Sequence, residues 1–150
     1  MRHENIILLV DDNPDFVELA RRAFLKSSVA NPLVVAEDGA EALDYLFATG
    51  AWADRTPADN PVLILLDLKL PKIDGLEVLR RLRADQRTRL IPVVILTTSS
   101  EEQDIIAGYE LGTNAYIRKP VDFAQLAEVL RQTGLFWLVI NEPPITKGEQ

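Results

Sequence analysis

Five short apolar runs, each followed by a longer segment of helical periodicity, constrain the fold of this chain most strongly. The runs are rich in Val, Ile and Leu, and most show no polar alternation, which is typical of strands buried on both faces. Between them, apolar residues recur three and four positions apart, as on the buried side of a helix. The runs lie at Ile6–Val10, Leu33–Ala36, Val62–Leu66, Val93–Leu96 and Ala115–Ile117.

This alternation predicts an α/β protein with a five-stranded parallel sheet covered by helices on both faces. Pro14 and Asp122 are typical of positions at which helices begin. The alternation alone does not choose between the two common open strand orders. The acidic residues after the first strand favour the flavodoxin-like, doubly wound (βα)5 order 2-1-3-4-5.

Length and composition predict one domain and exclude several classes of function. With 150 residues, we expect a domain over residues 1–140 and a flexible tail over 141–150, with no room for a second sizeable domain, so that a partner would be another chain. The net charge of −7 argues against direct nucleic-acid binding, and the absence of cysteine excludes disulfides and thiolate metal sites. We expect no secretory signal and no membrane span, hence a cytoplasmic protein.

The residues with chemical potential follow the predicted strands. Asp11 and Asp12 come after the first strand, Asp67 after the third, Thr97 after the fourth and Lys119 after the fifth. The carboxyl ends of parallel strands share one edge of the sheet, and ligands bind at that edge. We therefore expect these five side chains to converge.

Three carboxylates at one edge repel one another, by about 4 kcal/mol for two unit charges 4 Å apart at an effective dielectric of 20. Lys119 offsets only part of this repulsion, so a bound hard cation such as Mg²⁺ is the simplest remedy. Taken singly, each residue has an ordinary explanation. Asp12 could cap the next helix, Thr97 could form a local hydrogen bond, and Lys119 could be a solvated surface lysine.

Four segments together resemble the signature segments of two-component response-regulator receiver domains. They are ILLVDDN, LILLDLKLPKIDGLEVL, VVILTTS and AYIRKPVD, and the resemblance covers about residues 6 to 135. It implies a signalling protein whose only catalysis is its own phosphorylation and dephosphorylation. By this resemblance Asp67 accepts the phosphoryl group from a sensor histidine kinase.

The same resemblance implies a Mg²⁺ site. Asp12 and Asp67 would be direct ligands together with the backbone carbonyl of Lys69, and Asp11 would bind through water. The Lys69 side chain is a less usual choice at this position, and we expect it to alter autodephosphorylation. We expect Gly75 where the loop turns into the third helix, because glycine permits positive φ and close backbone approach.

The resemblance also assigns a switch. Thr97 would hydrogen-bond the phosphoryl group and Lys119 would form an ion pair with it. As Thr97 moves inward, Tyr116 would rotate from an exposed orientation into the vacated space. The same tyrosine would also suit an amphipathic edge strand.

Two further segments leave their roles open. The connection Ala48–Pro61 is unusually long and is read as a tolerated surface insertion. The apolar segment Gly134–Ile140 either folds back onto the domain or forms a partner surface anchored by Phe136 and Trp137. With the long connection, Phe-Trp-Leu after the last helix resembles the response regulators paired with phytochromes, which implies a phytochrome partner and a homodimer.

Three alternatives are weighed against the receiver. A haloacid-dehalogenase-like phosphatase needs a second Asp two residues after its nucleophile, where this chain has Lys69. A flavodoxin-like FMN carrier needs a phosphate-binding loop, where Asp11 and Asp12 would repel phosphate. A receiver-like interaction module that works without phosphorylation stays open, because intact site residues do not prove that a kinase exists.

Overall fold

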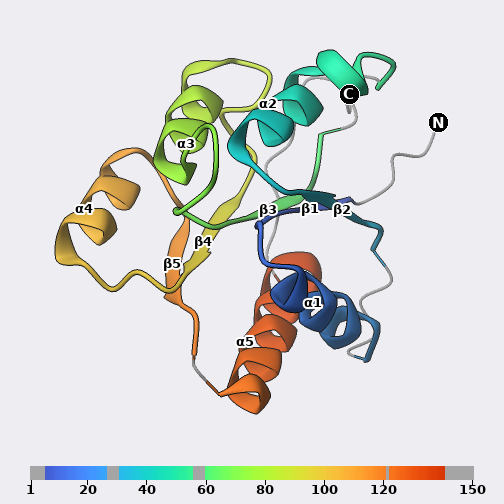
Figure 1. The fold of residues 1–150 in the computed structure, drawn as a ribbon, viewed down its shortest axis with the longest axis vertical. Helices are drawn as coiled ribbons and strands as arrows, with labels where there is room; N and C mark the ends of the chain where they lie inside the picture. Colours follow the sequence, from blue (N-terminus) through green and yellow to red (C-terminus); the bar gives the residue numbers. More distant parts are fainter. Residues whose placement is uncertain (1–5, 27–30, 56–59, 121, 141–150) are drawn as a thin grey trace.

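The computed structural model describes residues 6–26, 31–55, 60–120 and 122–140 and contains one parallel sheet with helices on both faces (Figure 1). The strand order is β2-β1-β3-β4-β5, which confirms the predicted flavodoxin-like order. Side chains of the three central strands are fully buried, whereas those of the edge strands β2 and β5 are mostly half-buried. The strands are β1 (Ile7–Val10), β2 (Leu33–Ala36), β3 (Leu63–Leu66), β4 (Val93–Thr97) and β5 (Ala115–Arg118).

The helices divide between the two faces of the sheet. Helices α1 and α5 pack together on one face, and α2 and α3 cover the other, with α4 beside β5 (Figure 1). Each face has its own apolar core, because alternate residues of β1, β3 and β4 point to opposite sides. The helices are α1 (Pro14–Lys26), α2 (Gly39–Phe47), α3 (Gly75–Ala84), α4 (Glu102–Glu110) and α5 (Phe123–Leu135).

The helix starts follow capping rules. The expected starts at Pro14 and Asp122 are confirmed, and the Asp122 side chain accepts a hydrogen bond from the Gln125 amide. The cap of α1 differs from the one considered for Asp12. Asn13 Oδ1 caps the helix, because it accepts from the amides of Asp15 (2.9 Å) and Phe16 (3.2 Å). Asp12 is exposed and takes no part in the cap.

Part of the long connection after α2 is an ordered appendage. A short 3₁₀ turn, Gly50–Trp52, brings the Trp52 ring edge-on to Tyr45 at 4.8 Å between centroids. The Arg55 guanidinium lies over the same Tyr45 ring and donates to the carbonyls of Tyr45 and Leu46. This part therefore stabilises the end of α2, as a surface insertion would; residues 56–59 lie outside the described part of the chain.

The C-terminal segment folds back onto the domain, as the first of the two alternatives expected, and its use as a partner surface stays a prediction. A π-helical turn, Phe136–Ile140, continues directly from α5. Trp137 and Leu138 are half-buried against the core beneath α1 and α5, whereas Phe136 is 46% exposed and meets the Trp137 ring edge-on at 5.2 Å. The tail expected over residues 141–150 lies outside the described residues.

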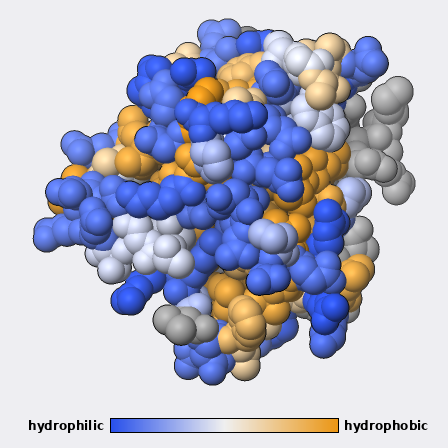
Figure 2. All heavy atoms as spheres, in the orientation of Figure 1, coloured by the Kyte–Doolittle hydropathy of each residue, from blue (hydrophilic) through white to orange (hydrophobic). Residues whose placement is uncertain are grey.

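Hydrophilic residues cover most of the face drawn in Figure 2, and apolar atoms show in patches between them. Among the described residues, no helix is long and apolar enough to cross a membrane.

Candidate functional site

Three carboxylates meet at the carboxyl edge of the sheet. Asp11 and Asp12 follow β1 and Asp67 follows β3, and the two strands pair in register up to Val10 and Leu66. One carboxylate oxygen from each aspartate lies within 4.8 Å of the others. The predicted convergence is therefore confirmed for the carboxylates.

Lys119 enters the same cluster from the end of β5. Its Nζ lies 2.6 Å from Asp11 Oδ2 and 3.6 Å from Asp67 Oδ2, and its side chain is 9% exposed. Its backbone amide donates to the carbonyl of Thr97 at 2.7 Å, which ties the end of β5 to the end of β4. The ordinary explanation of Lys119 as a surface lysine is wrong.

Burial dominates the electrostatics of Asp11. This side chain is 1% exposed, and burial raises its pKa above the ordinary value. The hydrogen bond and charge of Lys119 oppose that rise, and the negative charge of Asp67 adds to it. Asp11 is therefore a carboxylate whose charge is costly in the metal-free protein even with a lysine in contact.

The backbone around Asp67 is tightly packed. Asp67 Oδ1 accepts from the Leu68 amide at 2.8 Å, which orients the carboxylate. A Cβ at Gly75 would lie 2.1 Å from the carbonyl oxygen of Asp67, so the close approach expected of Gly75 is confirmed. The positive φ expected there is wrong: in this loop Lys72 has it, at 67°.

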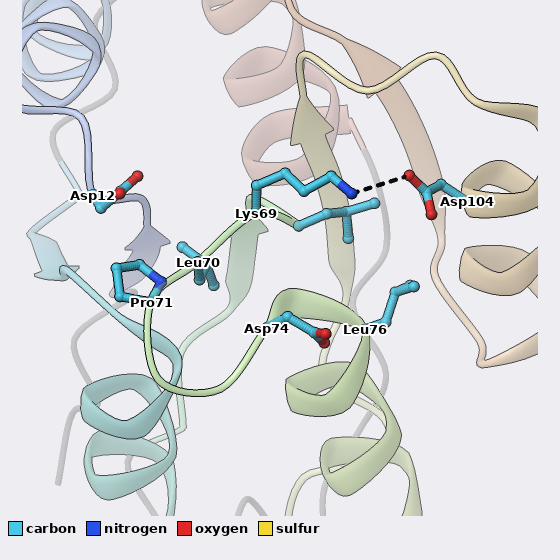
Figure 3. A pocket seen from close by; sticks show the side chains of 8 residues that line it. Asp12, Lys69, Leu70, Pro71, Asp74, Leu76 and Asp104 are labelled. Atoms are coloured by element: carbon cyan, nitrogen blue, oxygen red, sulfur yellow. Dashed lines mark ion pairs between the residues drawn. The ribbon is translucent and has the colours of Figure 1, made fainter.

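A groove of about 410 Å³ opens beside the carboxylates. Figure 3 shows Lys69 reaching across it from the loop after β3 toward Asp104 in the first turn of α4. Lys69 Nζ lies 3.8 Å from Asp104 Oδ2. The groove is lined by Asp12, Leu68, Lys69, Leu70, Pro71, Asp74, Leu76 and Asp104.

Asp104 connects this groove to Tyr116. The Ser99 hydroxyl donates to Asp104 Oδ2 at 2.6 Å, and the Tyr116 hydroxyl donates to the Ser99 carbonyl at 3.0 Å. Tyr116 is half-buried, so the exposed orientation expected for it is not the one in this structure. Burial is the largest cause that raises the pKa of Tyr116, and the negative charge of Asp104 adds to the rise.

Thr97 is fully buried at the end of β4, and its Oγ1 accepts from the Ser99 amide at 3.4 Å. The local hydrogen bond that a strand-end threonine usually makes is thus present. Because Oγ1 is the acceptor in this bond, the hydroxyl proton stays able to turn toward another acceptor.

The donor set fits a hard divalent cation. Asp12 is exposed and forms no capping bond, and Asp67 Oδ1 accepts from an amide. Both oxygens of Asp11 are engaged, Oδ1 by the Asn13 amide and Oδ2 by Lys119. Carboxylate oxygens with waters are what Mg²⁺ and Mn²⁺ prefer, whereas a thiolate or imidazole site is not offered by these residues.

Comparison with known proteins decides the family. The model of the response regulator receiver domain matches residues 7–131. This chain belongs to the response regulator receiver family. Receivers are signalling domains of two-component systems, and the acidic cluster beside a lysine fits the family's phosphoryl-acceptor site.

Several similar receivers are phytochrome response regulators. The phosphorylated cyanobacterial phytochrome response regulator RcpA matches with a TM-score of 0.88 and 39% identity, over 95% of this chain and 99% of that one. The bacteriophytochrome response regulator AtBRR matches with a TM-score of 0.73 and 50% identity, over 94% and 100%.

Response regulator Rcp1 of Synechocystis sp. is 38% identical over 89% of this chain and 88% of its own length. Its Mn²⁺-bound structure matches with a TM-score of 0.88 and 36% identity, over 94% and 99% of the two chains. Rcp1 therefore binds a divalent metal.

Two residues of the site were not singled out from the sequence. Asp104 reads locally as an acidic residue favourable in the first turn of a helix. Phe16 reads as one of the apolar residues of α1, yet Lys119 Nζ lies over its ring, 4.0 Å from the centroid. No local signal identifies the contact of Asp104 with Lys69 or that of Phe16 with Lys119, because each joins residues more than 30 positions apart.

Proposed function

We propose that this protein is a single-domain response regulator that accepts a phosphoryl group on Asp67 with Mg²⁺ and thereby changes its partner-binding face. One observation carries the proposal: Asp67 meets two further carboxylates and a buried lysine, Lys119, at the edge of the sheet where ligands bind. The family match agrees with it.

The proposed chemistry is a phosphoryl transfer. A carboxylate oxygen of Asp67 attacks the phosphorus of a phosphohistidine, an O–P bond forms, and the N–P bond breaks with its electron pair passing to the imidazole. Acetyl phosphate would serve as a small donor. Lys119 neutralises charge on the equatorial oxygens, so the site contributes positioning and electrostatic stabilisation.

In the proposed metal site, Asp12, Asp67 and the carbonyl of Lys69 are direct ligands and Asp11 binds through water. The cation, when bound, neutralises charge on the carboxylates and on the transferred group. The exposure of Asp12 and the Mn²⁺-bound structure of Rcp1 support this assignment. Asp11 is buried and in contact with Lys119, which agrees with its binding the metal through a water molecule and not directly.

The proposed switch uses Thr97 and Tyr116. An acyl phosphate on Asp67 adds charge and acceptor oxygens and draws the Thr97 hydroxyl toward it. That movement would disturb Ser99, because the Ser99 amide donates a hydrogen bond to Thr97 Oγ1. The Ser99 carbonyl in turn accepts from the Tyr116 hydroxyl. The face formed by α4, β5 and α5 would change in response.

The proposed partners are a sensor histidine kinase, specifically a phytochrome, and a second copy of this chain. The similarity to RcpA, Rcp1 and AtBRR supports the phytochrome pairing. Exposed Phe136 beside half-buried Trp137 supports an apolar dimer contact. We further propose that the domain spans residues 1–140 and acts in the cytoplasm without contacting nucleic acid.

The decisive experiment is phosphorylation of purified protein, read by intact mass. With acetyl phosphate and Mg²⁺ the wild type should gain one phosphoryl group, and Asp67→Asn should gain none. If neither acetyl phosphate nor a phosphorylated histidine kinase labels the wild type, the phosphorylation-independent module replaces this proposal. For the dimer, sedimentation should show the wild type as a dimer and Phe136→Ala shifted toward monomer. A wild-type protein that sediments as a monomer would contradict the proposed dimer.

A further inference from the structure

Lys119 has a third neighbour besides its two carboxylates. Its Nζ lies 2.6 Å from Asp11 and 3.6 Å from Asp67, and it sits over the ring of Phe16, 4.0 Å from the centroid. An ammonium over an aromatic face is attracted by the electron density of the ring, and the attraction is strongest where water is excluded. With Lys119 at 9% and Phe16 at 4% exposure, this contact is desolvated.

The Phe16 ring is held in place by its own surroundings. Its backbone amide donates to Asn13 Oδ1 in the cap of α1, so the first turn of that helix sets its position. Its side chain belongs to the apolar core beneath α1 and α5, which includes Leu9, Leu96 and Leu126. A ring fixed in this way presents one face to Lys119 and cannot follow the lysine if it moves.

The ring differs from the carboxylates in one respect that matters for phosphoryl transfer. Asp11 and Asp67 belong to the acidic cluster that fits a divalent cation, so a metal competes with Lys119 for their charge. A cation in the cluster also repels the ammonium. The Phe16 face attracts Lys119 without being a ligand for a hard cation, so its attraction persists when the carboxylates are engaged.

We propose that Phe16 is a positioning residue, whose ring face holds the Lys119 ammonium at the acceptor site during phosphoryl transfer to Asp67. This inference rests on the proposed function. It predicts that the electron density of the ring, and not only its volume, sets the rate of phosphorylation. A purely structural role in the core would depend on shape alone.

The test replaces Phe16 with 4-fluoro-, 3,4,5-trifluoro- and pentafluorophenylalanine, which nearly preserve shape while progressively weakening the ring face. The rate of labelling by acetyl phosphate should fall in that order, by about three- to ten-fold at pentafluorophenylalanine. The matched control places the same residues at Phe24, which is 3% exposed in the same core and about 12 Å further along α1. There the labelling rate should not follow fluorination.

A second readout needs neither metal nor phosphoryl donor. In metal-free protein, the ε-methylene proton signals of Lys119 should be shifted upfield by the Phe16 ring current, and Phe16→Leu should abolish that shift. Phe16→Leu should also slow labelling, and Phe16→Tyr, which keeps the aromatic face, should restore it.

The two levels of inference fail separately. Wild-type protein that labels normally while every fluorinated Phe16 variant labels at the same rate would overturn the positioning role and leave the proposed function intact. A Lys119 signal without an upfield shift would likewise overturn it. Wild-type protein that takes no label from any donor would overturn the proposed function, and the positioning role with it.

Discussion

Lys69 and Asp104 join the acceptor loop to the fourth helix, with Nζ 3.8 Å from Oδ2 across the groove beside the carboxylates (Figure 3). Asp104 is also the acceptor for the Ser99 hydroxyl, and the Ser99 carbonyl accepts from Tyr116. A charge two residues after Asp67 is therefore connected, through three contacts, to the tyrosine assigned to the switch.

We expect Asp104→Asn to lengthen the lifetime of the phosphorylated protein. The amide keeps an acceptor for Ser99 but removes the charge that holds Lys69, so the lysine is free to pair with the phosphoryl group and exclude attacking water. Because the lysine of this ion pair is largely exposed, the lifetime of the phosphorylated protein should increase by only about two- to five-fold. Loss of label with time, followed by intact mass, measures it.

The control for this effect is Lys69→Asn. By itself it should change the dephosphorylation rate, and in its background Asp104→Asn should have no further effect, because the two residues act as a pair. If Asp104→Asn still slowed dephosphorylation to the full extent in the Lys69→Asn background, the Asp104 carboxylate would act without Lys69, contrary to this prediction. An unchanged rate in Lys69→Asn would contradict the role of the lysine altogether.

Addition of Mg²⁺ should raise the melting temperature of the protein. The three clustered carboxylates repel one another, and burial makes the charge of Asp11 costly, so a bound cation stabilises the folded state. At ten times the dissociation constant the gain in unfolding free energy is about 1.4 kcal/mol.

Asp12→Asn should raise the metal-free melting temperature slightly, because it removes one of three mutually repelling charges, and it should abolish most of the gain with Mg²⁺. Differential scanning calorimetry with and without EDTA would measure both. Equal Mg²⁺ stabilisation of the wild type and Asp12→Asn would remove Asp12 from the ligand set.

Gly75→Ala should destabilise the fold by about 2 kcal/mol or more, because the new Cβ would lie 2.1 Å from the Asp67 carbonyl oxygen, which is backbone and cannot move aside. Gly108→Ala in α4 is the matched comparison. Its Cβ would lie 2.9 Å from the Cδ1 end of the Ile95 side chain and in ordinary contact with Tyr116 and Thr113, with no backbone atom in the way. Alanine also favours the helix, so we expect a smaller loss than at Gly75. Urea unfolding of both variants decides the matter; equal losses would contradict the packing argument.

Glu77 should contribute to stability in a defined pH window. Hydrogen bonds from Arg80 and then Arg81 lower its pKa from 4.5 to about 2. A carboxyl whose pKa is lower in the folded state stabilises the protein above pH 4.5 and loses that contribution as the pH falls toward 2. Glu77→Gln should therefore flatten the fall of the melting temperature between pH 4.5 and 2, by a small amount because the group is on the surface. A steeper fall in the variant would contradict this sign.

Much of the candidate site could be predicted from the sequence because its signals are local. Continuous apolar runs mark buried strands wherever they occur, and the first residues after Val10, Leu66 and Leu96 are then placed at one edge by the geometry of parallel strands. The placement of Asp67 and its neighbours at that edge could therefore be predicted without knowing how the helices pack on the sheet.

Contacts set by packing had no such signal. Asn13 rather than Asp12 caps α1, and Gly75 is required for close approach rather than for positive φ. In each case the residue type permitted both roles, and only the path of the neighbouring backbone chose between them.

The sequence by itself determined the α/β class and the residues at the acceptor edge, since hydrophobic periodicity and strand polarity are properties of short segments. It favoured the observed strand order, which the tertiary structure then decided. Only the tertiary structure decided that Lys119 is buried over Phe16 and that Lys69 faces Asp104. Partners that lie 35 or more positions apart meet through the packing of whole helices on the sheet, and no local pattern encodes that meeting.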